Sequence, residues 1–122
     1  MEFSHLTKAL WIVALGPMFL PIQTISAVAD DVIIHIKAGP NRFQEKVVQV
    51  KPGDQVIWKN MAGSHTATPD ANQPDPFPDT GDVPTNGGTS NPWVASGSPR
   101  TIKYHCDVHG PSMSGEIIVL AQ

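Results

Sequence analysis

Cysteine is almost missing from this chain, which has one, Cys106, among its 122 residues. A single cysteine cannot form an intramolecular disulfide, so a small fold stapled by disulfides is excluded. In an exported protein an exposed unpaired thiol is a liability. We therefore expect Cys106 to be a metal ligand or, as the alternative, a buried structural residue.

Other absences narrow the function further. The sequence has no cluster of lysine or arginine and a formal net charge of −3, which argues against nucleic acid or another polyanion as a partner. No apolar run reaches the roughly 20 residues of a membrane-spanning helix. There is no internal repeat, and no segment after residue 30 has the apolar period of an amphipathic helix.

The N-terminus has the features of a secretory signal. Lys8 precedes a short apolar run over Ala9–Leu20, and small residues follow at Ala27-Val28-Ala29. This pattern predicts a signal peptide over residues 1–29, cleaved after Ala27 or Ala29, and a mature domain over residues 30–122. We expect a periplasmic or otherwise exported protein without a membrane span after cleavage. An uncleaved membrane anchor is the alternative.

The rest of the chain predicts strands. Runs rich in β-branched residues alternate with turns that contain Gly, Pro, Asn and Asp. The expected strands are Val32–Lys37, Glu45–Val50, Asp54–Lys59, Ser64–Thr68, Arg100–Cys106 and Glu116–Leu120. A structureless loop over residues 69–99 would be unusually long, so we expect further short strands there. The pattern indicates an all-β sandwich.

A metal site is indicated near the C-terminus. His109 follows Cys106 by three positions, Met113 follows by four more, and His65 comes directly after a predicted strand. A thiolate, two imidazoles and a weak axial thioether are a donor set that copper takes. We predict that these four residues bind one metal ion. For Met113 the alternative is a core residue that fills a gap.

Strand parity separates the remaining histidines from this group. In the strand that ends at Cys106, the residues Ile102 and Tyr104 share its face, whereas His105 lies on the other. His35 likewise alternates with its apolar neighbours. We expect both histidines to lie at the surface rather than at the metal.

The order of these residues resembles that of small cupredoxins of the plastocyanin, pseudoazurin, amicyanin and halocyanin kind, from roughly Asp31 to Gln122. The resemblance implies a Greek-key β-sandwich and one type 1 (blue) copper (Cu²⁺/Cu⁺). It is carried by His65, Tyr104, Cys106, His109, Met113 and the closing run Gly115–Val119. The sequence departs from the family pattern at two places. Thr66 follows the first histidine, where the family commonly has asparagine. Asp107-Val108 lie between the cysteine and the second histidine, where the family often has a proline. These departures leave the redox potential and the blue or green character open.

The resemblance also implies roles for neighbouring residues. The backbone N–H of Thr66 would donate to the Cys106 sulfur, and Asn60 would tie the two ligand loops together. His109 would be the port for electrons, set in an apolar patch where protein partners dock transiently. Candidates for this patch are Met61, Ala62, Pro111 and Pro40.

Three functions compete. The first is a monomeric one-electron carrier without catalytic activity. The second is a periplasmic copper chaperone or store, although the chain after residue 29 has only Met61 and Met113 and no Met-rich or His-rich motif. A copper enzyme of this superfamily would need a second histidine cluster, which His35 and His105 do not form. A metal-free interaction domain would follow if His65 lay far from Cys106.

Overall fold

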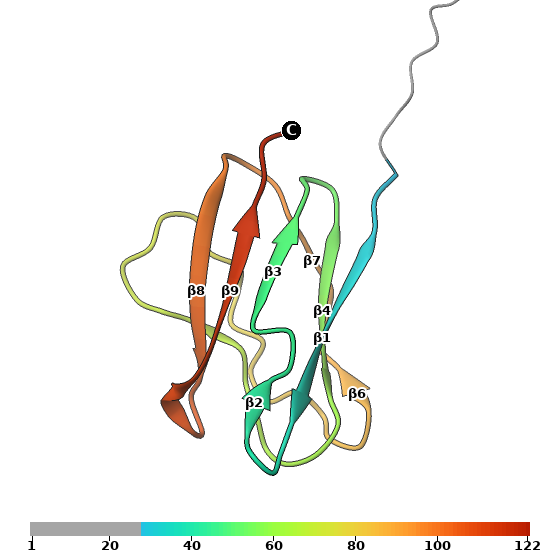
Figure 1. The fold of residues 1–122 in the computed structure, drawn as a ribbon, viewed down its shortest axis with the longest axis vertical. Helices are drawn as coiled ribbons and strands as arrows, with labels where there is room; N and C mark the ends of the chain where they lie inside the picture. The colour runs from blue at the N-terminus through green and yellow to red at the C-terminus, as the bar shows by residue number, and fades with distance from the viewer. Residues whose placement is uncertain (1–27) are drawn as a thin grey trace, which may run out of the picture.

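The structure, a computed structural model that describes residues 28–122, is a sandwich of two β-sheets (Figure 1). No helix occurs among the described residues, so the predicted all-β sandwich is confirmed. The strands are β1 (Asp31–Lys37), β2 (Arg42–Phe43), β3 (Val47–Val50), β4 (Gln55–Asn60), β5 (Thr68–Pro69), β6 (Gly88–Thr89), β7 (Trp93–Val94), β8 (Arg100–Cys106) and β9 (Gly110–Val119).

Both sheets are mixed. One has the order β2-β1-β4-β6, with β7 also paired to β4, and the other has the order β3-β9-β8-β5. The pairs β1/β4 and β3/β9 are parallel and the others antiparallel. Because consecutive strands often belong to different sheets, the chain crosses repeatedly between the two layers.

The predicted strands match the observed ones best where a run of β-branched residues is long. β8 has the predicted bounds, and β1, β3 and β4 differ slightly at their ends. The strand predicted at Ser64–Thr68 is wrong in extent, because only a single bridge joins Thr66 to Asp82 before β5 begins. β2 was not predicted, and β9 begins well before Glu116, since the turn after Cys106 is short.

An aromatic cluster fills the space between the sheets. The rings of Trp58 on β4 and Tyr104 on β8 have centroids 5.6 Å apart, and Phe77 lies 4.7 Å from Trp58. Tyr104 packs so closely on Gly115 that a Cβ at Gly115 would come within 2.5 Å of the phenol. Burial raises the pKa of Tyr104 well above its usual range, so the phenol stays protonated. Cys106 lies on the same inward face two residues later.

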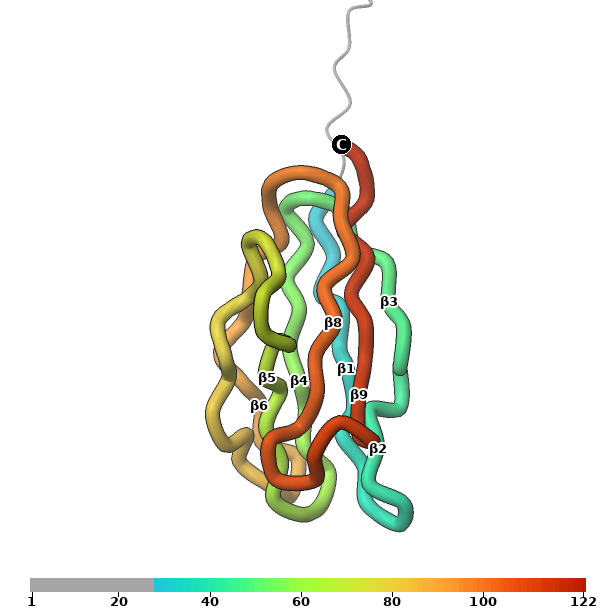
Figure 2. Tube along the Cα trace, turned by 90° about the vertical axis from the view of Figure 1, so that its left-hand side faces the viewer, coloured from blue at the N-terminus to red at the C-terminus, as the bar shows by residue number. Residues whose placement is uncertain are grey.

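Two loops meet at one end of the sandwich, at the bottom of Figures 1 and 2. One follows β4 and leads to His65, and the other is the turn over residues 107–109 between β8 and β9. The candidate ligands therefore come together at this end, although they lie far apart in the sequence.

The predicted signal peptide, residues 1–29, lies outside the described residues except for Val28 and Ala29. Within the described part of the chain, no helix has the length and hydropathy that crossing a membrane requires.

Candidate metal centre

His65 is fully buried, and its ring is fixed by one hydrogen bond. The Nε2 atom lies 2.8 Å from the carbonyl oxygen of Ala62. A carbonyl can only accept, so Nε2 carries the proton and Nδ1 keeps its lone pair. The loop after β4 therefore presents Nδ1 of His65, ready to act as a ligand.

The pKa of His65 lies below its ordinary value of 6.5. Burial is the largest cause because it disfavours the imidazolium, and the neighbouring His109 adds to the effect, whereas the Ala62 carbonyl opposes it. The ring is therefore neutral at neutral pH, which is the form that binds a metal ion.

Cys106 and His109 complete a group of three. The Sγ atom of Cys106 lies 3.9 Å from Nδ1 of His65 and 3.5 Å from Nδ1 of His109. Cys106 and His65 are buried and His109 is half-buried. The three ligand atoms all lie within 4.8 Å of one another. One thiolate and two imidazoles at this spacing could hold one copper ion.

Met113 lies close by in sequence, in the irregular first part of β9. The ladder pairs His105 with Ser114 but Cys106 with Gly110, so the register shifts between these two positions. An unbroken register would have placed Met113 opposite Cys106. This irregularity changes which residue of β9 lies opposite Cys106. Met113 is 2% exposed and packs in the core, so its axial role stays a prediction.

Thr66 links the two ligand loops. Its backbone N–H donates to the Cys106 Sγ over 3.4 Å, the contact that the resemblance implies. Its side-chain Oγ1 accepts the backbone N–H of Asp107 over 2.9 Å. The first hydrogen bond fixes the position of the Cys106 sulfur, and the second holds the residue that follows it.

Comparisons with known proteins support this architecture. No protein-family model and no curated protein matches the sequence. Among solved structures, a copper-containing nitrite reductase from Thermus scotoductus SA-01 matches with a TM-score of 0.65 and 20% identity over 84% of this chain. Two amicyanin variants in the Cu(I) state each match with a TM-score of 0.60, at 18% and 19% identity over 74% and 79% of this chain.

The chain has the cupredoxin fold. It covers 82% and 86% of the two amicyanin chains but only 25% of the nitrite reductase chain. At these identities the likeness concerns the fold, and the chemistry has to be argued from the residues at the site.

Within this cupredoxin fold, Asn60 has a different task from the one expected. Its Nδ2 donates to the carbonyls of Gly63 (2.8 Å) and Val83 (2.9 Å), and its Oδ1 accepts the N–H of Ala62 (3.2 Å). These contacts shape the loop that carries His65. The hydrogen bonds between the two ligand loops come from Thr66 instead, because Asn60 at the end of β4 faces the crossing segment around Val83.

The other histidines lie outside the metal group. His35 bonds Glu45 through Nδ1 over 2.9 Å. His105 is 24% exposed, and its Nδ1 and Nε2 lie 2.6 Å from Asp70 and 3.1 Å from Asp107. The hydrogen bond with Asp70 is the largest cause of the raised pKa of His105. The expected surface position of His105 is therefore only partly right, since two carboxylates cover its ring edges.

Apolar side chains are exposed on both ligand loops. Met61 is 40% exposed and Val108 is 51% exposed, and Ala62 and Pro111 are exposed as well. Val108 was not predicted to belong to this surface. Its position in the turn between Cys106 and His109 was the available signal, because a turn that short cannot bury all its side chains.

Proposed function

We propose that this protein binds one copper ion (Cu²⁺/Cu⁺) through His65, Cys106 and His109, with Met113 as the weak axial ligand, and carries single electrons between redox proteins. The observation that supports it best is the convergence of three donor atoms within 4.8 Å. When bound, copper would supply the change of oxidation state, which no side chain here supplies alone.

The protein's part is to hold the donors in one arrangement. The Ala62 carbonyl fixes the ring of His65, and the Thr66 N–H orients the Cys106 sulfur. The position of Cys106 at the end of β8 and the hydrogen bonds of the His65 loop keep these groups in place whether the charge at the centre is higher or lower. A trigonal set of two imidazoles and a thiolate with a weak axial thioether suits both copper oxidation states.

His109 is the proposed port for the electron. It is only half-buried, whereas His65 and Cys106 are buried. The exposed side chains of Met61, Val108 and Pro111 come from the loops that carry these ligands. A small apolar surface suits a transient protein partner. We infer that the protein works as a monomer that meets its donor and acceptor in turn.

The cellular setting is part of the same proposal. We infer that residues 1–29 are a signal peptide and that residues 30–122 form the exported domain, which fits an unpaired cysteine protected by a metal. We propose no catalytic activity for this domain, because His35 and His105 do not form a second metal-binding cluster among the described residues. A copper chaperone or store is the alternative that the following test separates.

The test is a visible absorption and EPR spectrum of the protein loaded with Cu(II). We expect an intense thiolate-to-copper band and narrow copper hyperfine splitting, both lost in Cys106→Ala and both kept in His35→Ala, whose histidine lies outside the group. A pale, ordinary Cu(II) spectrum would contradict the electron carrier. Tight binding of Cu(I) alone would then favour copper handling.

A further inference from the structure

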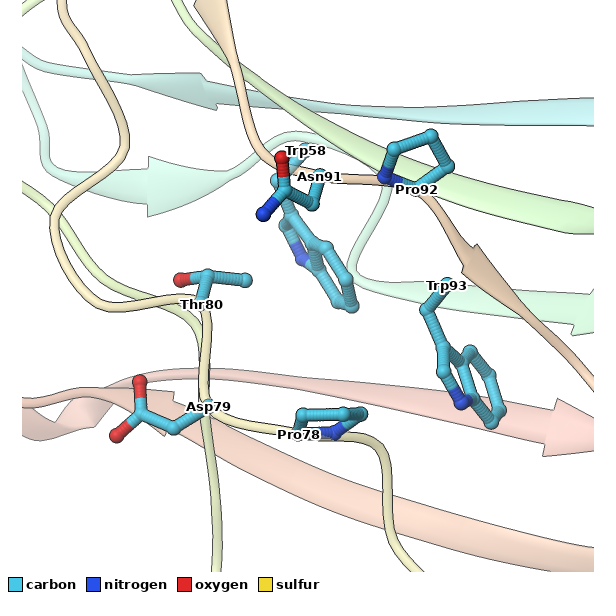
Figure 3. Close-up of a pocket in the computed structure, with 7 residues that line it drawn as sticks. All are labelled: Trp58, Pro78, Asp79, Thr80, Asn91, Pro92 and Trp93. Carbon is cyan, nitrogen blue, oxygen red and sulfur yellow. The ribbon is translucent and has the colours of Figure 1, made fainter.

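Asn86 is the one asparagine of this chain that is followed by glycine. An asparagine loses its side-chain amide when the next backbone nitrogen attacks the side-chain carbonyl carbon. Glycine leaves this attack unhindered, because it has no side chain. Asn91, which lines the cavity in Figure 3 together with Pro92, is closed to the reaction because a proline nitrogen carries no hydrogen. The three other asparagines, Asn41, Asn60 and Asn72, precede arginine, methionine and glutamine.

Asn86 and Gly87 are the central residues of a tight turn. The N–H of Gly88 donates to the carbonyl of Thr85 over 3.3 Å, and the two central residues have φ values of +58° and +89°. Positive φ at both central positions is typical of a type I′ turn, which prefers asparagine followed by glycine. Asn86 is exposed at this turn, so its side chain is in contact with water.

A short hydrogen bond restrains the nitrogen that would attack. The N–H of Gly87 donates to the carbonyl of Asn60, at the end of β4, over 2.7 Å. The attack requires this nitrogen to lose its proton and to face the Asn86 side chain, so it cannot proceed while the hydrogen bond lasts. The reaction therefore needs the turn to open. Opening is local, because β6 pairs with β4 only at Gly88 and Thr89.

The acceptor of this hydrogen bond belongs to the residue that shapes the His65 loop. The side chain of Asn60 binds the carbonyl of Gly63 over 2.8 Å and the N–H of Ala62 over 3.2 Å. The Ala62 carbonyl in turn fixes the ring of His65 over 2.8 Å. A continuous chain of hydrogen bonds thus joins the turn at Gly87 to a proposed copper ligand.

We propose that Asn86 is a site of self-modification and that its isoaspartate product loosens the loop that carries His65. The Gly87 nitrogen forms a bond to the side-chain carbonyl carbon of Asn86, the bond from that carbon to the amide nitrogen breaks, and ammonia leaves with the proton from Gly87. Water then opens the resulting five-membered imide. Opening at the side-chain carbonyl gives aspartate, and opening at the backbone carbonyl gives isoaspartate.

The two products differ in backbone length. In isoaspartate the chain runs through the side chain, which adds one carbon atom between Asn86 and Gly87. A two-residue turn cannot hold this extra atom while Gly88 stays opposite Asn60 in the ladder of β4 and β6. We therefore expect isoaspartate to break the hydrogen bond from Gly87 to Asn60. Aspartate keeps the normal backbone and tolerates positive φ, so it should keep that bond.

The first experiment follows deamidation of the metal-free protein by mass spectrometry and peptide mapping, in native buffer and in guanidinium chloride at the same pH. We expect an amide to be replaced by a carboxyl group at Asn86, at least about tenfold faster in the unfolded chain. Asn86→Gly, which suits a positive φ, is the control and should show no such change in this peptide. Absence of the reaction at Asn86 in the unfolded chain, or equal rates in both conditions, would overturn the inference.

The second experiment compares the refolded isoaspartate form with Asn86→Asp. In the metal-free proteins, we expect the Ala62 N–H to exchange with solvent about fivefold faster in the isoaspartate form. The N–H of Gly53, bonded to the Ala95 carbonyl over 2.8 Å at the other end of the sandwich, should exchange equally in both (Figure 1). Equal exchange of Ala62 in the two proteins would overturn the link to the His65 loop.

An effect on copper rests on the proposed function, and a separate measurement tests it. We expect the isoaspartate form to bind copper more weakly than Asn86→Asp in competition with a chelator. Faster exchange of Ala62 with unchanged copper affinity would support the modification site and its link to the loop, and would count against His65 as a ligand. The deamidation and exchange measurements use metal-free protein, so their outcome does not depend on the proposed electron carrier.

Discussion

The backbone N–H of Thr66 donates to the sulfur of Cys106 over 3.4 Å, although the two residues are 40 positions apart. The residue that supplies this donor directly follows His65, and the residue that receives it ends β8. The peptide group that joins His65 to Thr66 therefore holds His65 close to Cys106, and both residues are proposed ligands. The hydroxyl of the same threonine holds Asp107, the residue after the cysteine.

Thr66→Ala separates these two contacts. The variant keeps the backbone N–H to Cys106 and loses the acceptor for the Asp107 N–H. We expect the free energy of unfolding of the metal-free protein to fall by about 1 kcal/mol, while the thiolate-to-copper band of the loaded protein keeps its intensity. Urea unfolding and absorption spectra check this. Thr101→Ala, at an exposed position on β8, is the control, and loss of the band in Thr66→Ala would contradict the division of roles.

Gly63→Ala tests the support of His65. Gly63 has a φ of +91°, and a Cβ there would lie 2.9 Å from Nε2 of His65, so it would push the ring away from the Ala62 carbonyl. Gly53 has a similar φ of +101°, but a Cβ there meets nothing within 4 Å. Both alanines bring backbone strain of about 1 kcal/mol. Only Gly63→Ala should also weaken copper binding, measured by competition with a chelator. Equal affinities in the two variants would show that the ring is not fixed by this contact.

The sequence was informative where the signal is local. The alternation in β8 predicted correctly that Ile102, Tyr104 and Cys106 face inward, because side-chain direction follows from strand geometry alone. The order of histidine, cysteine and histidine likewise indicated the group that the structure brings together.

Pairing between distant strands was not predictable in the same way. The register of the β8–β9 ladder shifts after His105, and no residue type at that place in the sequence predicts such a shift. The task of Asn60 depends on the carbonyl of Val83, which is 23 positions away. The pairing of β7 with β4 was likewise not predictable, although short strands were expected in that stretch of the sequence.

Asp54 should make stability depend on pH in the acid range. It is 3% exposed, and its carboxylate accepts the backbone N–H groups of Asp30 (2.9 Å) and Lys51 (2.8 Å). These bonds, with the charge of Lys51, hold the pKa of Asp54 below its ordinary value of 3.8, although burial opposes them.

Because the folded pKa is the lower one, Asp54 adds stability above about pH 4 and loses that contribution as the pH falls through the folded value. We expect urea unfolding at a series of pH values to show Asp54→Asn less stable than the natural protein at neutral pH, with the difference narrowing below about pH 4. A difference that stays constant down to about pH 2 would contradict this role for the carboxylate.

The same carboxylate would recognise a chain that begins at Asp30. If the bond after Ala29 is cut, the nitrogen that lies 2.9 Å from Oδ1 of Asp54 becomes an ammonium group. A hydrogen bond with charges on both partners is roughly twice as strong as a neutral one. We expect a protein starting at Asp30 to be more stable by about 1 kcal/mol at neutral pH than one starting at Val28.

A double-mutant cycle isolates that effect, with both starting points prepared by proteolysis of a leader and each combined with Asp54→Asn. The gain from starting at Asp30 should largely vanish in the two Asp54→Asn proteins, because the amide has no charge to pair with the ammonium. A gain of the same size in both backgrounds would mean that the shorter chain is favoured for another reason. If the proteins that start at Asp30 and at Val28 are equally stable with Asp54 present, the Asp54 carboxylate does not distinguish a backbone amide from a terminal ammonium group.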